Sequence, residues 1–481
     1  MPLILPGNVA SALGGGYEVA NSCRFNKGDT AYMHKTLSAG NRRTWTFSTW
    51  FKRISLGTQV TFGVVQTSTG DNNIMAMQIR ADNKLEVWDY AGGITASIVT
   101  NRLFRDVSAW YHVVVAADTT SGTANNRLRL YINGTEERGV GGYATDTMPS
   151  LNLDFNINQN TKVLKFGAYD GGSVGSPADF YFAETVFIDG TQYAASDFGE
   201  FDEDTPTVFK PKDVSELTFG TNGFYLDYED SSNLGNDANS GTDLTEVSLA
   251  ATDQCQDSPT NNFATLNPLD NAQSSATYSE GNCKWVTTTN AKYLWGRSTI
   301  GMSAGMWYAE FKATSIPEHG YIGICVDAPD DDTTFLTNGG ANDHVEYGYK
   351  TSDGNSYNNT GSSSYGDTYT DGDIIGVYLD LDNNKLYFAK NGTIQNSGTG
   401  ISITAAASNG YGEYFFCCAD GTSGTSGTFE ANFGNPSYTG TDKDDKNGYG
   451  SFEYDPSVGT FDSASKDFLA LCTKNLGSDG G

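Results

Sequence analysis

Large apolar side chains along this chain recur at every second position over short runs. Residues 45–51 read Trp-Thr-Phe-Ser-Thr-Trp-Phe, and residues 307–314 place Trp307, Ala309 and Phe311 in alternate positions. A period of two is that of a β-strand with one face on a core. The first run therefore predicts a half-buried strand, and no helical period of 3.6 residues competes with it.

Further runs of this kind predict a chain built almost entirely of strands. They occupy residues 74–80, 84–90, 110–117, 127–133, 163–169, 180–189, 321–326, 374–380, 385–389, 414–419 and 428–433. Asn133-Gly134 directly follows one of them, which favours a type I′ hairpin turn because both central residues must accept positive φ. The pattern predicts an all-β chain of two tandem antiparallel β-sandwich domains, jelly-roll-like, with long loops.

Shifts in composition predict where these domains begin and end. We expect an extended docking arm over residues 1–20, because its apolar start is too short and too rich in Pro for a helix. The next predicted segments are a first sandwich (21–230), a polar linker (231–256), a second sandwich (257–440) and a C-terminal extension (441–481). Phe468-Leu-Ala-Leu predicts a strand or short helix within that extension.

Charge and cysteine content exclude several classes of function. The 481 residues include 58 Asp and Glu but only 29 Lys and Arg, a formal net charge of −29. Such a surface repels phosphate backbones and anionic head groups, so we expect neither nucleic-acid binding nor membrane insertion. The seven Cys form no CxxC pair, and no signal peptide is evident. These features predict reduced thiols and synthesis in the cytoplasm.

Two ordered sets of motifs resemble known families. Phe47-Ser-Thr-Trp-Phe-Lys, Trp110-Tyr-His-Val-Val-Val-Ala-Ala-Asp, Leu130-Tyr-Ile-Asn-Gly and Phe182-Ala-Glu-Thr-Val-Phe-Ile-Asp-Gly resemble a concanavalin A-like lectin/glucanase domain of the laminin G-like kind over residues 45–190. Gly305-Met-Trp-Tyr-Ala-Glu-Phe, Gly320-Tyr-Ile-Gly-Ile, Tyr347-Gly-Tyr, Gly372-Asp-Ile-Ile-Gly-Val-Tyr-Leu-Asp and Leu386-Tyr-Phe-Ala-Lys-Asn-Gly resemble a SPRY domain over residues 305–433. The first resemblance implies a fold. The second also implies partner binding through loops.

Four other segments resemble structural proteins of tailed phages, many of them marine. They are Met1-Pro-Leu-Ile-Leu-Pro-Gly, Gly220-Thr-Asn-Gly-Phe-Tyr-Leu-Asp-Tyr, Pro259-Thr-Asn-Asn-Phe-Ala-Thr-Leu-Asn-Pro and Leu469-Ala-Leu-Cys-Thr-Lys-Asn-Leu. This resemblance implies a location on the virion surface as a tail fibre, spike or adhesin. It also implies a homo-oligomer such as a trimer, with the N-terminal arm bound to other virion subunits.

Motifs of catalysis are absent from the sequence. Glucanases of the concanavalin A-like fold resemble one another in a Glu-x-Asp-x-x-Glu strand, which this chain lacks, and Glu184 and Asp189 lie five apart on opposite faces of a strand. No HExxH, G-x-S-x-G or P-loop string occurs. We expect no enzyme, no catalytic residue and no required cofactor. A glycan depolymerase remains an alternative.

Aromatic side chains in polar loops are the candidate binding residues. We expect Trp295, Tyr349, Tyr357, Tyr365 and Tyr369 to contact a ligand, since tyrosines among Ser, Gly and Asn resemble antibody loops. Asp330, Asp331 and Asp332 are a candidate Ca²⁺ site. The predicted function is non-enzymatic binding of a host-surface glycan or protein. The alternative is a capsid or tail decoration or spacer protein that binds only other virion subunits.

Overall fold

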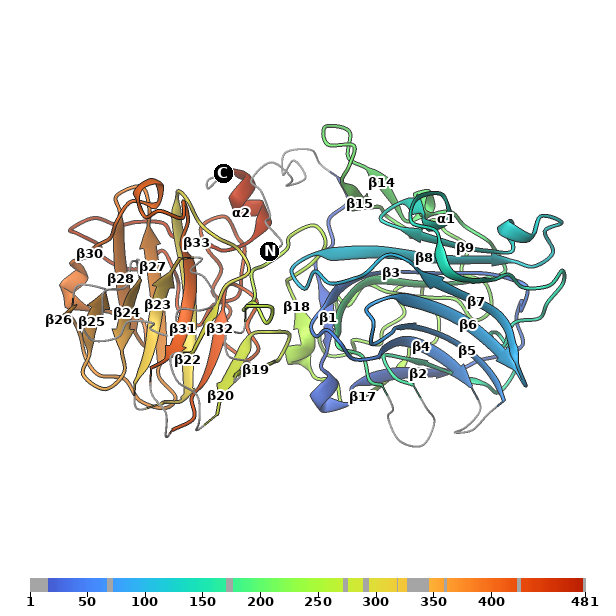
Figure 1. Cartoon of the computed structure of the whole chain (residues 1–481), viewed down its shortest axis with the longest axis horizontal. Coiled ribbons are helices and arrows are strands. Elements are labelled where there is room, and N and C mark those ends of the chain that lie inside the picture. Colours follow the sequence, from blue (N-terminus) through green and yellow to red (C-terminus); the bar gives the residue numbers. More distant parts are fainter. Residues whose placement is uncertain are drawn as a thin grey trace. The chain divides into compact units, whose positions relative to one another are not determined.

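The computed structural model describes residues 16–66, 72–169, 176–270, 276–288, 294–317, 319–326, 346–358, 361–421 and 425–478. The chain divides into two compact units, one ending at Thr260 and the other beginning at Asn261. Each unit contains two large sheets whose strands are almost all antiparallel, which confirms the predicted all-β fold (Figure 1). Within the described ranges, no helix is long and apolar enough to cross a membrane.

Helices are short in both units. They are α1 (Glu137–Val140), α2 (Thr473–Ser478) and the 3-10 turns Lys27–Asp29, Ala124–Asn126, Ala195–Asp197, Ala251–Asp253, Asn396–Gly398 and Ala406–Ser408.

The first unit is a sandwich of two eight-stranded sheets. The β3 sheet has the order β10 (Thr135–Glu136), β9 (Leu128–Ile132), β8 (Trp110–Asp118), β3 (Thr44–Arg53), β13 (Phe180–Asp189), β1 (Ser22–Phe25) and β18 (Gln254–Cys255), and β16 (Phe224–Leu226) also pairs with β13. The β6 sheet has the order β11 (Tyr143–Thr147), β7 (Ile94–Thr100), β6 (Leu85–Ala91), β5 (Asn73–Ile79), β4 (Val60–Gln66), β12 (Val163–Phe166), β2 (Tyr32–Thr36) and β17 (Thr245–Val247). A separate hairpin joins β14 (Gly199–Phe201) to β15 (Phe209–Pro211).

The β3 sheet is buried on both faces. Trp45, Phe47 and Phe51 lie in the core between the two sheets. On the opposite face, Trp50 packs in a second cluster with Phe209, which comes from the segment that follows β13. The prediction of a half-buried strand at residues 45–51 is therefore wrong, because a later segment of the chain covers its second face.

The second unit is a sandwich of the same kind. The β22 sheet has the order β19 (Ala276–Ser279), β20 (Lys284–Thr287), β32 (Thr428–Asn432), β22 (Met306–Ser315), β27 (Ile374–Asp380), β28 (Lys385–Lys390) and β29 (Thr393–Ile394), with β30 (Ile401–Ser402) beside β28 and β33 (Leu469–Ala470) parallel to β22. The β23 sheet has the order β21 (Leu294–Arg297), β31 (Phe415–Asp420), β23 (Gly320–Cys325), β24 (Tyr347–Lys350), β25 (Asn355–Asn358) and β26 (Gly361–Ser364).

Both segments expected to lie outside the sandwiches belong to them. Residues 231–256 supply β17, which pairs with β2, and β18, which pairs with β1. Residues 441–481 place Phe452, Phe461 and Phe468 against Tyr378 of the β22 sheet. The predicted linker and extension are corrected here. Edge strands of two or three residues and single aromatic anchors leave no long apolar run in a sequence. For the predicted arm, residues 1–15 lie outside the described residues.

Candidate functional site

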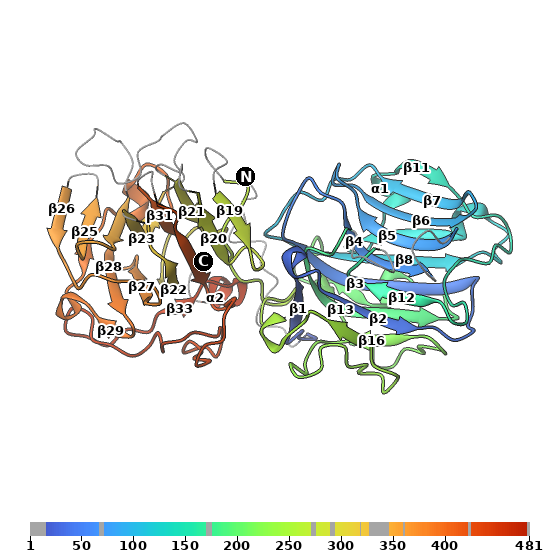
Figure 2. The ribbon, with the colours of Figure 1, turned by 90° about the horizontal axis from the view of Figure 1, so that it is seen from below.

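The solvent side of the β6 sheet carries aromatic and polar side chains in an ordered pattern. In β6, Leu85 and Val87 point into the core, while Glu86, Trp88 and Tyr90 alternate with them and are half-buried. Figure 2 shows β7, β6, β5 and β4 side by side in this sheet. The strand period of two thus separates the core side chains from a row that faces solvent.

Trp88 is the centre of this row. Across the ladder it lies opposite Ala76 of β5 on one side and Ser97 of β7 on the other. Both cross-strand neighbours are small, and the indole packs against Ile74 and Ala76 of β5. Tyr169 adds a second ring, with its centroid 6.5 Å from that of Trp88 and its plane tilted by 39°.

A row of hydrogen-bonded polar side chains lies on the same face of the sheet, two residues along the strand from Trp88. Gln59 Nε2 donates to Gln78 Oε1 (2.8 Å), and Gln78 Nε2 donates to Glu86 Oε2 (2.6 Å). Arg80 Nη1 lies 3.6 Å from Glu86 Oε1 and its Nε lies 3.3 Å from Asp82. These bonds fix the orientation of the side-chain amides and of the carboxylate. We call Gln78, Arg80, Glu86, Trp88, Tyr90 and Tyr169 the Trp88 face.

Asp89 anchors this strand from the inner side. Its carboxylate accepts hydrogen bonds from Thr95 Oγ1, from the backbone N–H of Asn156 (2.8 Å) and from Asn156 Nδ2 (3.1 Å). Burial raises the pKa of Asp89 although these bonds favour the ionised form. The result is a strand held at its end, so that Trp88 and Tyr90 project from a rigid element.

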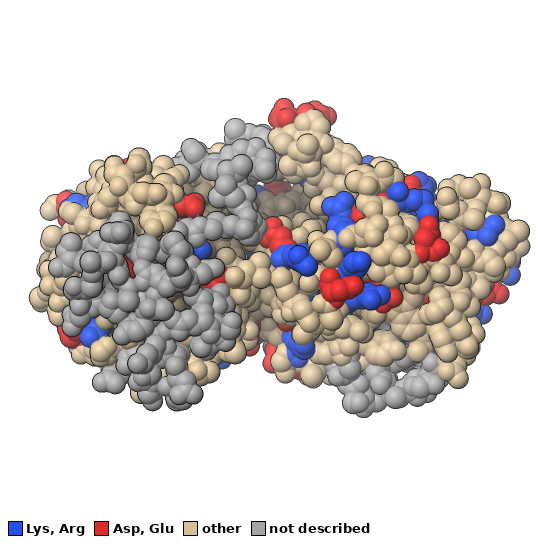
Figure 3. All heavy atoms as spheres, in the orientation of Figure 1, with Lys and Arg blue, Asp and Glu red and all other residues tan. Residues whose placement is uncertain are grey.

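The Trp88 face is suited to a neutral polyhydroxyl ligand. Aromatic faces pack on the C–H surface of a sugar ring, and a few fixed polar groups orient its hydroxyls. The local charge agrees with this reading. The first unit, Leu13–Thr260, contains 18 Lys and Arg and 31 Asp and Glu, but 15 of these acidic residues lie in 195–260, outside the face, and residues 13–194 contain 16 of each sign. On the side of the first unit seen in Figure 3, the two signs are interspersed.

Three of the predicted ligand-binding tyrosines are core residues. Tyr349, Tyr365 and Tyr369 are 0%, 6% and 2% exposed. The ring of Tyr349 stacks on Phe388 at 5.2 Å, and the Tyr369 hydroxyl donates to the Tyr349 carbonyl (2.9 Å). Buried rings cannot stack on a ligand, so this prediction is corrected. The error arose because Tyr365 and Tyr369 lie in a loop by sequence, and this loop folds onto the core.

The other predicted site residues have separate positions. Trp295 is buried in β21, in a cluster with Tyr321 and Phe415. Tyr357 is half-buried in β25, where its hydroxyl donates to Asp353 Oδ2 (2.7 Å). Asp330, Asp331 and Asp332 lie outside the described residues, so the Ca²⁺ prediction stays a prediction. Over the ranges that are described, no group of three or more His, Cys, Asp or Glu could hold a metal ion.

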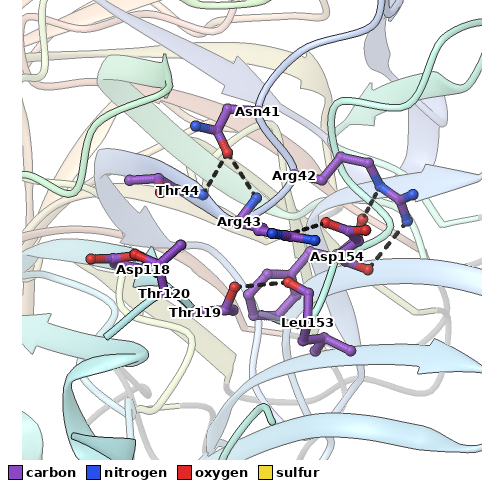
Figure 4. Close-up of polar contacts among 10 residues, drawn as sticks. Asn41, Arg42, Arg43, Thr44, Asp118, Thr119, Thr120, Leu153 and Asp154 are labelled. Carbon is purple, nitrogen blue, oxygen red and sulfur yellow. Dashed lines mark hydrogen bonds and ion pairs between the residues drawn. The ribbon is translucent and has the colours of Figure 1, made fainter. Parts of the chain in front are cut away.

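A polar rim at one end of the first sandwich is a second candidate site, but its side chains form hydrogen bonds and an ion pair that hold loops of the protein together. Arg42 Nε donates to the Phe155 carbonyl (2.7 Å), and Arg43 Nε lies 2.7 Å from Asp154 Oδ1 (Figure 4). Thr119 Oγ1 donates to the Leu153 carbonyl (2.8 Å). These bonds join the loop before β3 and the residue after β8 to the loop after β11. The charged groups are therefore already used within the protein.

The buried pair Ser48 and His112 does not form part of a catalytic triad among the described residues. His112 Nε2 lies 2.9 Å from Ser48 Oγ, while His112 Nδ1 has no hydrogen-bond partner among the described residues. Burial lowers the pKa of His112 to about 3. The pair lies under the segment that supplies Phe198 and Phe209, whose rings contact that of His112.

Comparisons with known proteins agree with the two folds. Residues 26–171 match the family model of the concanavalin A-like lectin/glucanases superfamily, and residues 305–429 match that of the SPRY domain. The chain therefore contains a concanavalin A-like domain followed by a SPRY domain, as the motifs predicted. Both are known as ligand-binding modules for carbohydrate or protein.

Similar proteins cover only part of this chain. It is 36% identical over 94 residues to the Ran-binding proteins 9/10 homolog of Drosophila melanogaster and 34% identical over 113 residues to human Ran-binding protein 9. These matches span 10% and 14% of those proteins, and 19% and 23% of this chain. Among solved structures, the SPRY domain of human HERC1 is 18% identical with a TM-score of 0.29, covering 34% of this chain and 96% of its own. Mouse laminin α1 LG4-5 is 10% identical with a TM-score of 0.28, covering 85% and 84%.

Sequence reasoning missed the Trp88 face although its signal was present. Residues 84–90 were identified as a strand, and Leu85 and Val87 define its core side. The same period places Glu86, Trp88 and Tyr90 on the other side. The predicted ligand-binding residues are aromatic residues of loops and do not include those on the outer face of this strand.

Proposed function

We propose that this protein is a non-catalytic recognition protein that binds a neutral glycan through the Trp88 face of its first sandwich. The observation that supports this most directly is Trp88, flanked by Ala76 and Ser97, beside the fixed Gln78–Glu86 pair. This replaces the loops of the second sandwich as the sugar-binding surface, because their tyrosines are buried.

We further propose that the protein acts on a phage virion surface, as a tail fibre, spike or adhesin that binds a host-surface glycan. The support is the resemblance of four segments, including Met1–Gly7 and Leu469–Leu476, to tailed-phage structural proteins. Residues 1–20 would bind neighbouring virion subunits, and the protein would form a homo-oligomer such as a trimer. Deleting residues 1–10 should then abolish incorporation into particles while both sandwiches stay folded.

The direct test is binding of the full chain to a glycan array and then to the best neutral glycan by titration. Trp88→Ala should weaken that binding about tenfold or more, as expected for a stacked aromatic at the centre of a site. Phe201→Ala is the matched control, because Phe201 is a 44% exposed aromatic on the separate β14–β15 hairpin.

Unchanged binding by Trp88→Ala would reject the Trp88 face. Absence of any array signal for the native chain would favour the decoration or spacer alternative. Release of reducing ends from a host polysaccharide would favour the depolymerase alternative. No residue of the Trp88 face is assigned a catalytic role in this proposal.

A further inference from the structure

The last strand of the β23 sheet has one edge with which no strand of the described residues pairs. β26 (Gly361–Ser364) pairs with β25 on one side, and all four of its residues are exposed. Its sequence is Gly-Ser-Ser-Ser, with no charge, no Pro and no irregularity in the register. An edge of this kind presents backbone N–H and C=O groups to which an extended segment can pair.

Most other edges of the described sheets differ from β26. β11 carries Asp146, which pairs with Arg138, and its register shifts between Tyr143 and Thr145. β17 carries Glu246, and β10, β18 and β29 are only two residues long. β21, the other edge of the same sheet, is buried and ends on Arg297. Natural sheets avoid edge pairing by charges, bulges and short strands. β26 is short, at four residues, but has no charge and no bulge, and unlike the equally long and uncharged β19 it is exposed at every residue.

The outer face beside β26 offers a place for a cationic side chain. Tyr357 of β25 lies opposite Ser362 of β26, and the small serine leaves its ring reachable from the edge. Lys350 Nζ already lies 5.2 Å from the centre of that ring, and Asp353 Oδ2 accepts the Tyr357 hydroxyl. Lys350 Nζ also lies 3.5 Å from Asp353 Oδ2, so a Lys or Arg on an added strand would share this aromatic ring and carboxylate with Lys350.

Charge also favours a basic partner over a second copy of this chain. Residues 261–481 contain 11 Lys and Arg against 27 Asp and Glu, a formal charge of −16. Asp353 and Asp367 flank the uncharged stretch 354–366, which contains the hairpin. Two copies would repel each other, whereas a basic segment would be attracted to this unit.

We propose that β26 accepts an extended, basic segment of a partner protein as an added antiparallel or parallel strand, with Tyr357 contacting one of its cationic side chains. Main-chain hydrogen bonds would supply the affinity and the Tyr357–Asp353 pair the preference for Lys or Arg. This surface is distinct from the Trp88 face and does not depend on glycan binding.

The experiment uses the full chain and a fluorescent Lys-Val-Thr-Val repeat peptide, with binding followed by anisotropy. Two derivatives are N-methylated on alternate residues, in opposite registers. An added strand donates N–H groups from every second residue, so one derivative should lose binding and the other should keep it. Equal binding by both derivatives, or equal binding of a Glu-Val-Thr-Val peptide, would overturn the proposal.

Variants locate the site on the protein. Ser362→Lys should weaken peptide binding about tenfold, because it places a like charge beside the incoming strand, and Tyr357→Ala should abolish the preference for Lys over neutral peptides. Thr145→Lys, on the exposed edge strand β11, is the matched control and should bind as the native chain does. If Ser362→Lys instead dissociates a native dimer in sedimentation, the occupant is a second copy and the proposal fails.

Discussion

The two sandwiches each bury a carboxyl group, and they satisfy it with different hydrogen-bond donors. In each, the outer face of one sheet is covered by further segments, and that sheet carries a buried carboxyl group. The group accepts from Tyr17 and from Tyr225 of β16 in the first unit, and from the covering segment in the second. In the first unit the carboxyl is Glu184 of β13, and in the second it is Glu310 of β22. The two carboxyl groups differ in how their charge is compensated.

Glu184 is compensated by hydroxyl groups alone. Its Oε2 accepts from Tyr225 (2.8 Å) and from Tyr17 (3.2 Å), and it sits at an irregularity of β13 with a φ of +49°. Burial raises the pKa of Glu184 to about 8. The carboxyl group is therefore held protonated at neutral pH, as part of a network of hydroxyl groups.

Glu310 is compensated by the backbone of its cover. It accepts from the N–H groups of Glu453 (2.9 Å) and Tyr454 (2.8 Å), and also from the Tyr308 hydroxyl and Asn432 Nδ2. Burial raises its pKa less, to about 7. Glu310 accepts more hydrogen bonds than Glu184, two of them from backbone N–H groups, and the nearby carboxylates Asp227 and Glu229 further raise the pKa of Glu184.

The largest expected effect concerns the segment that closes the first sandwich. Asp257 Oδ2 lies 2.7 Å from Lys52 Nζ, Asp257 Oδ1 accepts from Trp110 Nε1 (3.0 Å), and both charged side chains are buried. Asp257→Ala leaves the Lys52 ammonium without its carboxylate partner. We expect a loss of ~3–5 kcal/mol in the free energy of unfolding of the first unit, measured by hydrogen exchange in β3 and β8.

Asp154→Ala is the control for this prediction, because its ion pair with Arg43 is exposed on both sides. Its effect should stay below about 1 kcal/mol. If Asp257→Ala cost no more than this control, the buried pair would not anchor the closing segment.

The second prediction breaks the cover of the second sandwich. Glu310→Ala removes the acceptor of the Glu453 and Tyr454 N–H groups, which should cost about 1–3 kcal/mol. Faster hydrogen exchange should appear in residues 452–470, with β3 of the first unit unchanged. Glu453→Ala keeps its own backbone N–H bond to Glu310 and serves as the control. Uniform exchange throughout the second unit would contradict a role confined to the cover.

The third prediction uses the pH dependence of the free energy of unfolding to distinguish Glu184 from Glu310. A raised folded-state pKa adds stability that is complete below the unfolded value of 4.5 and is lost as pH rises through the folded value. The second unit should lose stability from about pH 4.5 upward, by at most about 1.4 kcal/mol per pH unit. In the first unit His112 opposes Glu184 up to about pH 6.5, so the loss there should begin above that pH. Between about pH 7 and 8 only the first unit should continue to lose it.

Glu184→Gln should flatten this dependence in the first unit alone. His112 of the first unit changes stability with pH in the opposite direction to Glu184. The pKa of His112 is lowered to about 3, so its neutral form contributes stability that is complete above the ordinary pKa of 6.5 and is lost as pH falls below it. Denaturant midpoints across this range test both signs. A slope unchanged in Glu184→Gln would show that Glu184 is ionised in the folded protein.

How much the sequence predicts depends on which face of a strand is considered. The period of two located β5, β6 and β8 within one or two residues, because one side of each packs on a core. It could not reveal that Phe209 covers Trp50, or that Tyr365 folds onto Phe388, since both contacts join segments far apart in the sequence. The segments that cover the outer sheet faces are placed by tertiary packing. Their sequences are mostly polar, so the few aromatic residues that pack on the sheets do not stand out.

The smallest expected effect on stability belongs to the residue expected to matter most for binding. Trp88 is half-buried and packs against Ile74, Ala76 and Tyr169 in a small cluster outside the core, so Trp88→Ala removes fewer packed atoms than a substitution in the core. We expect a change in the free energy of unfolding within about 1 kcal/mol. By contrast, Trp45→Ala in the core should cost ~3–5 kcal/mol. A large loss of stability in Trp88→Ala would mean that this face is a packing surface and that reduced glycan binding in that variant follows from unfolding.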